Sequence, residues 1–223
     1  AAAELVSFRE KMGLGRDGIV QIRLEARPLG RLDLRDFSGI ILGGSPFNSS
    51  DAVKFPLQQR VEADLALMMD EVLDRDYPLF GACYGVGTVG TAIGARIDGT
   101  YSEKPQVISV SLVREDPLLE GLPADFHTMV GHKEANTVLP DVATLLATGR
   151  TCPTQMFRVQ DNVYATQFHP ELAPAQFEQR LRIYANAGYY EPEELEDILA
   201  GTRGVDLTVD DQILRNFATR YAR

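Results

Sequence analysis

Cys83 is the residue whose type and surroundings point most directly to chemistry. It follows the short apolar run 78–82 and lies between Gly81 and Gly85. Glycines at these positions let the chain reverse sharply from a strand into a helix. Such a turn is a nucleophile elbow, which exposes the nucleophile and directs the next backbone N–H at an oxyanion. The alternative, a core cysteine in a glycine-rich turn, needs none of these features.

A histidine and a carboxylate follow a second predicted strand, at residues 162–168. They are His169 and Glu171, separated by Pro170. Side chains two residues apart in an extended segment point the same way, and Pro170 favours an extended His169. The carboxylate can then hold one imidazole nitrogen while the other faces a thiol, which is the arrangement of a catalytic triad. Alone, the tripeptide would be a chance match; with Cys83 it favours nucleophilic catalysis.

A glycine pair ends a third predicted strand, residues 38–42. Gly43 and Gly44 are followed by Ser45 and Pro46. Glycines at a strand end can leave backbone N–H groups free to point into a site, as an oxyanion hole requires. By itself this segment would be interpreted as an ordinary strand-to-loop turn.

Together the three segments resemble the class I, triad-type glutamine amidotransferases, especially the glutaminase domains of the GMP synthase branch. The matching motifs are residues 40–46, 81–85 and 167–171, in the family's order and at similar spacing. The resemblance covers about residues 1–188. It implies a flavodoxin-like α/β fold and a substrate, glutamine, whose ammonia passes to a synthetase or another acceptor protein.

The resemblance also implies a role for each motif residue. Cys83 would attack the side-chain amide of glutamine and form a γ-glutamyl thioester. His169, oriented by Glu171, would pass a proton to the departing ammonia and then activate water. The backbone N–H groups of Gly44 and Tyr84 would hold the oxyanion.

Two departures from the family pattern concern the substrate. The family usually has a glutamine four residues after the cysteine, where this chain has Gly87, and a Ser-His-Gly-Asp-like stretch whose counterpart here is residues 129–134. The missing side chain at Gly87 raises a second hypothesis, a hydrolase of γ-glutamyl compounds or other small amides. A third is a non-catalytic binding or regulatory subunit. The candidate substrate contacts are Ser45, Gly87, Val130, Gly131 and His132.

Composition excludes several classes of partner. A net charge of −10 argues against nucleic-acid binding, which relies on clustered Lys and Arg. No apolar stretch is long enough to span a bilayer, and no signal peptide is visible. The two cysteines, Cys83 and Cys152, are too few for a disulfide framework, so a reducing cytoplasm is expected and Cys152 is interpreted as a structural thiol. No cofactor is expected, and His127 and His132 lack the partners of a metal site.

Alternating helix and strand patterns predict an α/β fold with a mainly parallel, flavodoxin-like sheet, flanking helices and a C-terminal helical extension. We expect a class I amidotransferase domain at 1–188 and the extension at 189–223, either a cap on the domain or a docking element. The related domains begin with a central strand, so we expect further residues upstream of Ala1. The predicted helices are 1–12, 60–74, 84–94, 174–187, 191–199 and 210–221; the further predicted strands are 18–25, 106–113, 126–131, 143–148 and 155–159.

A Gly-x-Gly-x-x-Gly match at residues 85–90 would favour a dinucleotide-binding enzyme if Cys83 and His169 were absent. It follows a strand and opens a helix, with Glu103 at about the expected distance. Close packing of the helix against the sheet explains the same glycines. We therefore prefer the amidotransferase interpretation.

Overall fold

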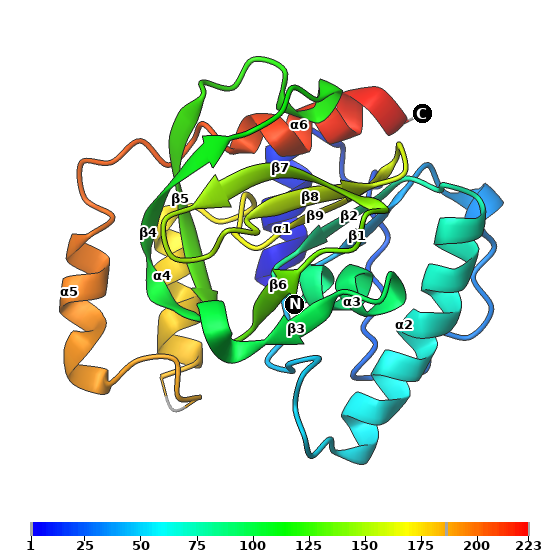
Figure 1. Ribbon diagram of the computed structural model, residues 1–223, viewed down its shortest axis with the longest axis horizontal. Coiled ribbons are helices and arrows are strands. Elements are labelled where there is room, and N and C mark those ends of the chain that lie inside the picture. The colour runs from blue at the N-terminus through cyan, green and yellow to red at the C-terminus, as the bar shows by residue number, and fades with distance from the viewer. Residues whose placement is uncertain (1, 186, 223) are drawn as a thin grey trace.

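A sheet of seven strands, in the order β1-β2-β9-β8-β7-β4-β5, forms the centre of the protein (Figure 1). The computed structural model describes residues 2–185 and 187–222. The strands of this sheet are β1 (Ile40–Leu42), β2 (Leu79–Ala82), β4 (Glu103–Leu112), β5 (Asp125–His132), β7 (Ala143–Gly149), β8 (Met156–Val159) and β9 (Val163–Thr166). A small second sheet pairs β3 (Arg96–Asp98) with β6 (Ala135–Val138).

The predicted α/β fold is confirmed, but the sheet is mixed rather than mainly parallel. Strands β1, β2 and β9 pair in parallel, as expected of a flavodoxin-like sheet. The pairs from β9 through β8, β7 and β4 to β5 are antiparallel. Short connections, such as the turn between β8 and β9, impose antiparallel pairing, because a parallel crossover needs a dozen residues or more. The parallel pairing therefore lies in the three strands that carry the predicted motifs.

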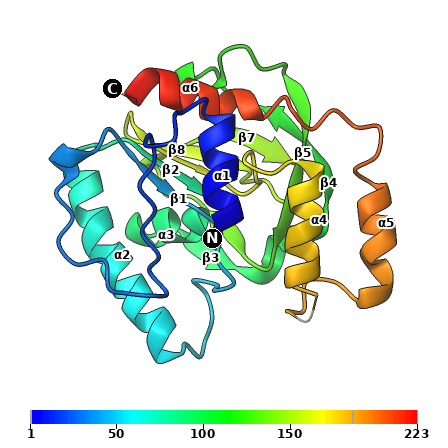
Figure 2. The same cartoon turned by 180° about the vertical axis from the view of Figure 1, so that it is seen from behind.

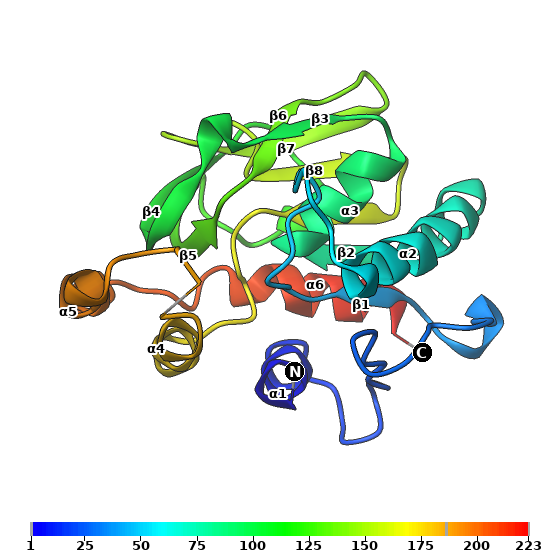
Figure 3. The same cartoon turned by 90° about the horizontal axis from the view of Figure 1, so that it is seen from below.

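Helices cover both faces of the parallel strands (Figures 2 and 3). Successive side chains of a strand point to opposite faces. Phe80 and Tyr164 pack with α1 and α6, whereas Leu79 and Val163 pack with α2 and α3. Helices α4 and α5 form a further apolar cluster beside β5. The helices are α1 (Ala2–Lys11), α2 (Pro56–Asp74), α3 (Tyr84–Ala92), α4 (Pro174–Ile183), α5 (Leu195–Ala200) and α6 (Asp211–Tyr221).

The C-terminal helix α6 contributes to the main core. Ile213 and Leu214 are fully buried, and the ring of Phe217 lies 5.7 Å from that of Phe80 on β2. Apolar positions three and four residues apart place these side chains on one face of the helix. These contacts make α6 part of the main apolar core.

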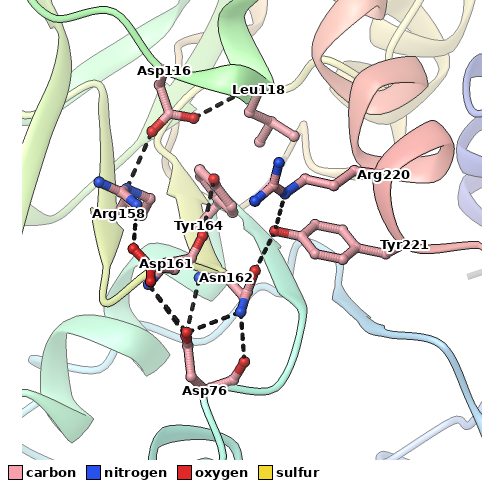
Figure 4. Close-up of polar contacts among 9 residues, drawn as sticks. All are labelled: Asp76, Asp116, Leu118, Arg158, Asp161, Asn162, Tyr164, Arg220 and Tyr221. Carbon is pink, nitrogen blue, oxygen red and sulfur yellow. Dashed lines mark hydrogen bonds and ion pairs between the residues drawn. The ribbon is translucent and has the colours of Figure 1, made fainter.

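A polar network fixes this helix at the amino ends of β2 and β9 (Figure 4). The Asp76 carboxylate accepts hydrogen bonds from the backbone and side-chain nitrogens of Asn162, at 3.0 and 2.9 Å. The Tyr221 hydroxyl donates to Asn162 Oδ1 at 2.7 Å. These contacts hold the amino ends of the parallel strands in place. The candidate site lies at their carboxyl ends.

Most of the predicted elements are confirmed, with shifted ends, but the strand predicted at 18–25 is wrong. This segment runs as turns and irregular chain, and Val20 is 67% exposed. Alternation of apolar and polar residues does not produce a strand where no neighbouring strand accepts the backbone hydrogen bonds. The short strands β3 and β6 were not predicted.

Candidate active site

The predicted elbow is present at Cys83, between β2 and α3. Cys83 has a φ of +54°, in the left-handed region that residues other than glycine rarely adopt. A Cβ on Gly81 would lie 2.9 Å from the Cα of Gly85, so the chain crosses itself too closely there for a side chain. This local strain directs the Cys83 side chain away from the sheet.

Parallel pairing brings His169 to the same end of the sheet. Ala82 is in register with Thr166, and the Cys83 backbone N–H donates to the Thr166 carbonyl at 2.8 Å. His169 follows three positions further along and donates its backbone N–H to Met129 on β5 at 3.0 Å. Cys83 and His169 consequently line one cavity of about 640 Å³, although 86 positions separate them in the sequence.

Glu171 lies behind His169, on the side away from the cavity. Nδ1 of His169 donates to Glu171 Oε1 at 2.8 Å, and Glu171 is fully buried. Burial disfavours the charged forms of His169 and Glu171, but the attraction between their opposite charges outweighs this penalty. The pKa of Glu171 is lowered by His169 and Arg180, while Glu171 and Cys83 raise the pKa of His169 to about 10. At neutral pH the histidine is therefore an imidazolium held between a carboxylate and the sulfur of Cys83.

Arg180 on α4 and Glu4 on α1 also reach this group, although neither was predicted from the sequence. Nη1 of Arg180 lies 3.1 Å from His169 Nδ1 and 3.5 Å from Glu171 Oε1. Nη2 of Arg180 donates to Glu4 Oε1 at 3.1 Å. Contacts from helices so distant in the chain leave no local sequence signal.

The two backbone N–H groups predicted for the oxyanion hole differ in their surroundings. Tyr84 is the first residue of α3, where an N–H has no acceptor within the helix. The Gly44 N–H instead donates to Glu4 Oε1 at 2.9 Å. A Cβ on Gly44 would lie 3.4 Å from His169 Cε1, so this residue borders the imidazole.

Ser45 and Gly131 line the cavity beside Cys83 and His169, whereas Gly87, Val130 and His132 are absent from its described lining. A Cβ on Gly87 would meet Ser49 Oγ at 2.4 Å and Glu134 Oε1 at 3.0 Å. The Glu134 carboxylate is held by the backbone N–H groups of Ser49 and Ser50, at 2.6 and 2.7 Å. The space beside Gly87 is thus filled, and this glycine does not enlarge the cavity.

The second cysteine lies outside the cavity. Cys152 is fully buried, and burial raises the pKa of its thiol to about 12, which disfavours the nucleophilic thiolate. Among the described residues, one group of three possible metal ligands lies close enough together to share an ion, and its members are Glu103, His132 and Cys152. None of the three is among the described lining of the cavity.

Comparison with known families agrees with this geometry. The sequence model described as "Glutamine amidotransferase class-I" matches residues 19–183, which is most of the chain. The chain belongs to this family. The match includes the elbow at Cys83 and the segment from His169 to Glu171.

Within the family, the chain is similar to GMP synthases. It is 28% identical over 148 residues to a protein of Methanothermobacter thermautotrophicus named as one subunit of a glutamine-hydrolysing GMP synthase, covering 65% of this chain and 71% of that protein. It is 30% identical over 122 residues to the GMP synthase of Thermosipho melanesiensis, covering 54% of this chain and 23% of that protein. The chain spans about a quarter of the length of the first curated relatives that it matches.

The fold matches a glutamine amidotransferase of Thermotoga maritima, with a TM-score of 0.72 and 21% identity, covering 88% of this chain and 82% of that one. At this identity the likeness concerns the fold alone. None of the helices in the described part of the chain is long and apolar enough to cross a bilayer.

Proposed function

We propose that this protein hydrolyses glutamine to glutamate and ammonia through a thioester on Cys83. The observation that carries the proposal is the shared cavity of Cys83 and His169, with Glu171 bonded to the far nitrogen of the imidazole. A thiolate, a proton-transferring histidine and an orienting carboxylate are the parts of a cysteine-based acyl transfer. Membership of the class I amidotransferase family supports glutamine as the acyl donor.

In the first half-reaction, Cys83 Sγ attacks the side-chain carbonyl carbon of glutamine. The C–O π electrons move to oxygen, and the N–H groups of Gly44 and Tyr84 stabilise the resulting oxyanion. The oxyanion collapses, the C–N bond breaks, and His169 supplies the proton with which ammonia leaves. A γ-glutamyl thioester remains on Cys83.

The raised pKa of His169 suits this step, because the imidazolium already carries the proton that ammonia needs. Once the proton has left and the sulfur is acylated, the imidazole is neutral and faces an uncharged thioester. It can then take a proton from water, whose oxygen attacks the thioester carbonyl and releases glutamate and the thiolate. Glu171 holds the ring throughout, from the side opposite the substrate.

The ammonia would pass to a synthetase or another acceptor protein. Support comes from the relatives named as one subunit of a glutamine-hydrolysing GMP synthase, since that name implies a partner subunit in those proteins. The alternative substrates, larger γ-glutamyl compounds, were suggested by a missing side chain at Gly87. Since Ser49 and Glu134 fill that space, glutamine is the better-supported substrate.

A glutaminase assay tests the proposal. We expect the wild-type chain to release glutamate and ammonia from glutamine, Cys83→Ala to be inactive, and His169→Ala to lose at least about a thousandfold in kcat. Ser109→Ala, at an exposed position on β4, is the matched control and should retain full activity. Turnover that survives in Cys83→Ala would contradict the mechanism, and an inactive wild-type chain would contradict hydrolysis without a partner.

A further inference from the structure

A second group of reactive side chains is buried at the junction of three antiparallel segments, outside the cavity. Glu103 begins β4, His132 ends β5, and Cys152 lies in the turn between β7 and β8. Their exposed fractions are 3%, 4% and 0%, and their potential ligand atoms lie within 4.8 Å of one another. Buried groups of this kind are normally paired or coordinate a metal.

Hydrogen bonding determines how the His132 ring is presented to this group. Nδ1 lies 2.9 Å from the carbonyl oxygen of Glu134, which can only accept, so Nδ1 carries a proton. Nε2 then faces Glu103 Oε2, also at 2.9 Å. Two lone pairs at this distance would repel, so a positive charge must lie between them, either a proton or a metal ion. A backbone carbonyl on the other ring nitrogen is the usual support of a metal-binding histidine.

The amide of Gln155 gives an independent indication. Its Nε2 donates to Glu103 Oε2 at 2.8 Å, which places the amide at the edge of the group. Gln155 is fully buried, and its Oε1 has no hydrogen-bond partner within the described part of the chain. Buried acceptors without a partner are rare and call for an explanation. A metal ion, or a water bound to it, would provide one.

We propose that Glu103, His132 and Cys152 bind a divalent cation of the zinc type. Sulfur, imidazole and carboxylate ligands together favour zinc over magnesium or calcium, which prefer oxygen alone. With a thiolate, a carboxylate and a neutral imidazole, the buried site would carry no net charge.

The geometry needs only a small adjustment. Tetrahedral zinc with bonds of about 2.0 Å to N or O and 2.3 Å to S separates its ligand atoms by roughly 3.2–3.7 Å. The distance of 2.9 Å between His132 and Glu103 is slightly shorter, and the whole group lies within 4.8 Å. Cys152 Sγ, which contacts the Thr154 carbonyl at 3.5 Å, would have to turn from that oxygen toward the ion.

The bound ion would cross-link three segments of the chain beside the active site. The ion would join β4, β5 and the β7–β8 turn, and Gly131, which precedes His132, lines the cavity with Cys83. The proposed role is structural, since none of the three ligands is among the described lining of the cavity.

Cobalt and zinc binding test the proposal, with Cys83→Ala as the parent protein, because Cys83 and His169 could themselves hold a metal. We expect the parent to bind one Co²⁺ per chain, with a sulfur-to-cobalt charge-transfer band, and zinc to displace the cobalt. Adding Cys152→Ala should abolish the band and weaken zinc binding more than about 100-fold, beyond the loss typical of an outer partner. Zinc should raise the Tm of the parent but not of the double variant.

Folding of each variant is checked by circular dichroism. If Cys152→Ala does not fold, Cys152→Ser keeps the side-chain volume and should remove the charge-transfer band alone. A parent protein that binds neither metal would overturn the proposal. So would a cobalt band that persists in the folded Cys152 variant.

Discussion

Glu4 accepts a hydrogen bond from the backbone N–H of Gly44, with 2.9 Å between Oε1 and N. Arg180 fixes the same carboxylate oxygen at 3.1 Å. In the proposed mechanism this N–H must instead point at the substrate oxyanion. A carboxylate and an oxyanion cannot share one donor at close range, because like charges repel. Under the proposed mechanism Glu4 would have to withdraw before the reaction, and its contact with Gly44 would restrain the site until then.

Removal of the Glu4 carboxylate should accordingly activate the enzyme. We expect Glu4→Ala to raise kcat/KM for glutamine by about tenfold, because a hydrogen bond to a charged group contributes roughly 1.5–3 kcal/mol and part of it is screened. Steady-state glutaminase kinetics measure the change. Glu10→Ala, at an exposed position on the same helix, should have no effect. A fall in kcat/KM for Glu4→Ala would show that Glu4 supports catalysis rather than restraining it.

The raised pKa of His169 predicts a pH-dependent stability. It is about 10 in the folded protein, against about 6.5 for an exposed histidine. The charged ring therefore stabilises the fold fully below about pH 6.5, and this contribution is lost as the pH rises through about 10. In urea unfolding, the free energy of unfolding of wild type should exceed that of His169→Gln most strongly near pH 6. This difference should become smaller toward pH 10. In a Cys83→Ala background the effect should shrink, because Cys83 helps to raise the pKa. A difference that grows with pH would contradict this assignment.

Gly87 is expected to resist even the smallest side chain. A methyl group there would lie 2.4 Å from Ser49 Oγ. Alanine improves helix propensity by about 1 kcal/mol, but overpacking costs about 1–3 kcal/mol, so Gly87→Ala should not stabilise α3 as an ordinary helical substitution would. Denaturant unfolding checks this, and adding Ser49→Gly should recover the lost stability. If Gly87→Ala alone were more stable than wild type by the full helix-propensity difference of about 1 kcal/mol, the space beside Gly87 would be open.

The C-terminal helix should be required for stability. Phe217→Ala removes a buried ring that packs on Phe80, and such truncations cost about 3–5 kcal/mol. Arg215→Ala, on the exposed side of α6, should cost less than about 0.5 kcal/mol. Equal unfolding midpoints for the two variants would mean that α6 is detachable, as a docking element would be.

Local sequence patterns were sufficient for the elbow and for the His169 segment. Gly81 and Gly85 lie two residues before and two residues after Cys83, and Pro170 separates His169 from Glu171. Each motif therefore contains the residues that its local geometry requires. The pairing of these motifs was inferred from their complementary chemistry and from the resemblance to the amidotransferase family. The parallel register of β2 and β9 brings the ends of the two motif strands to the same edge of the sheet.

Contacts between distant segments could not be predicted in the same way. Glu4 and Arg180 are 176 positions apart and meet only through the packing of α1 and α4. Glu103, His132 and Cys152 come together through the antiparallel register of β4, β5 and β7, which no spacing in the sequence reveals. The strand predicted at 18–25 failed for a related reason. Its alternating pattern is local, but a strand also needs a neighbour, and none of the described strands pairs with this segment.

Mass spectrometry after incubation with a glutamine-derived diazoketone tests the central claim most directly. The reagent places a ketone where the amide carbonyl of glutamine would lie and an alkylating diazo carbon where the amide nitrogen would lie. The account therefore predicts one adduct per chain, on Cys83. Cys83→Ala should give no adduct, and excess glutamine should slow the labelling of the wild type. An unmodified Cys83 that still reacts with a generic alkylating agent would contradict the account, because the thiol would then be reactive in a pocket that does not accept glutamine.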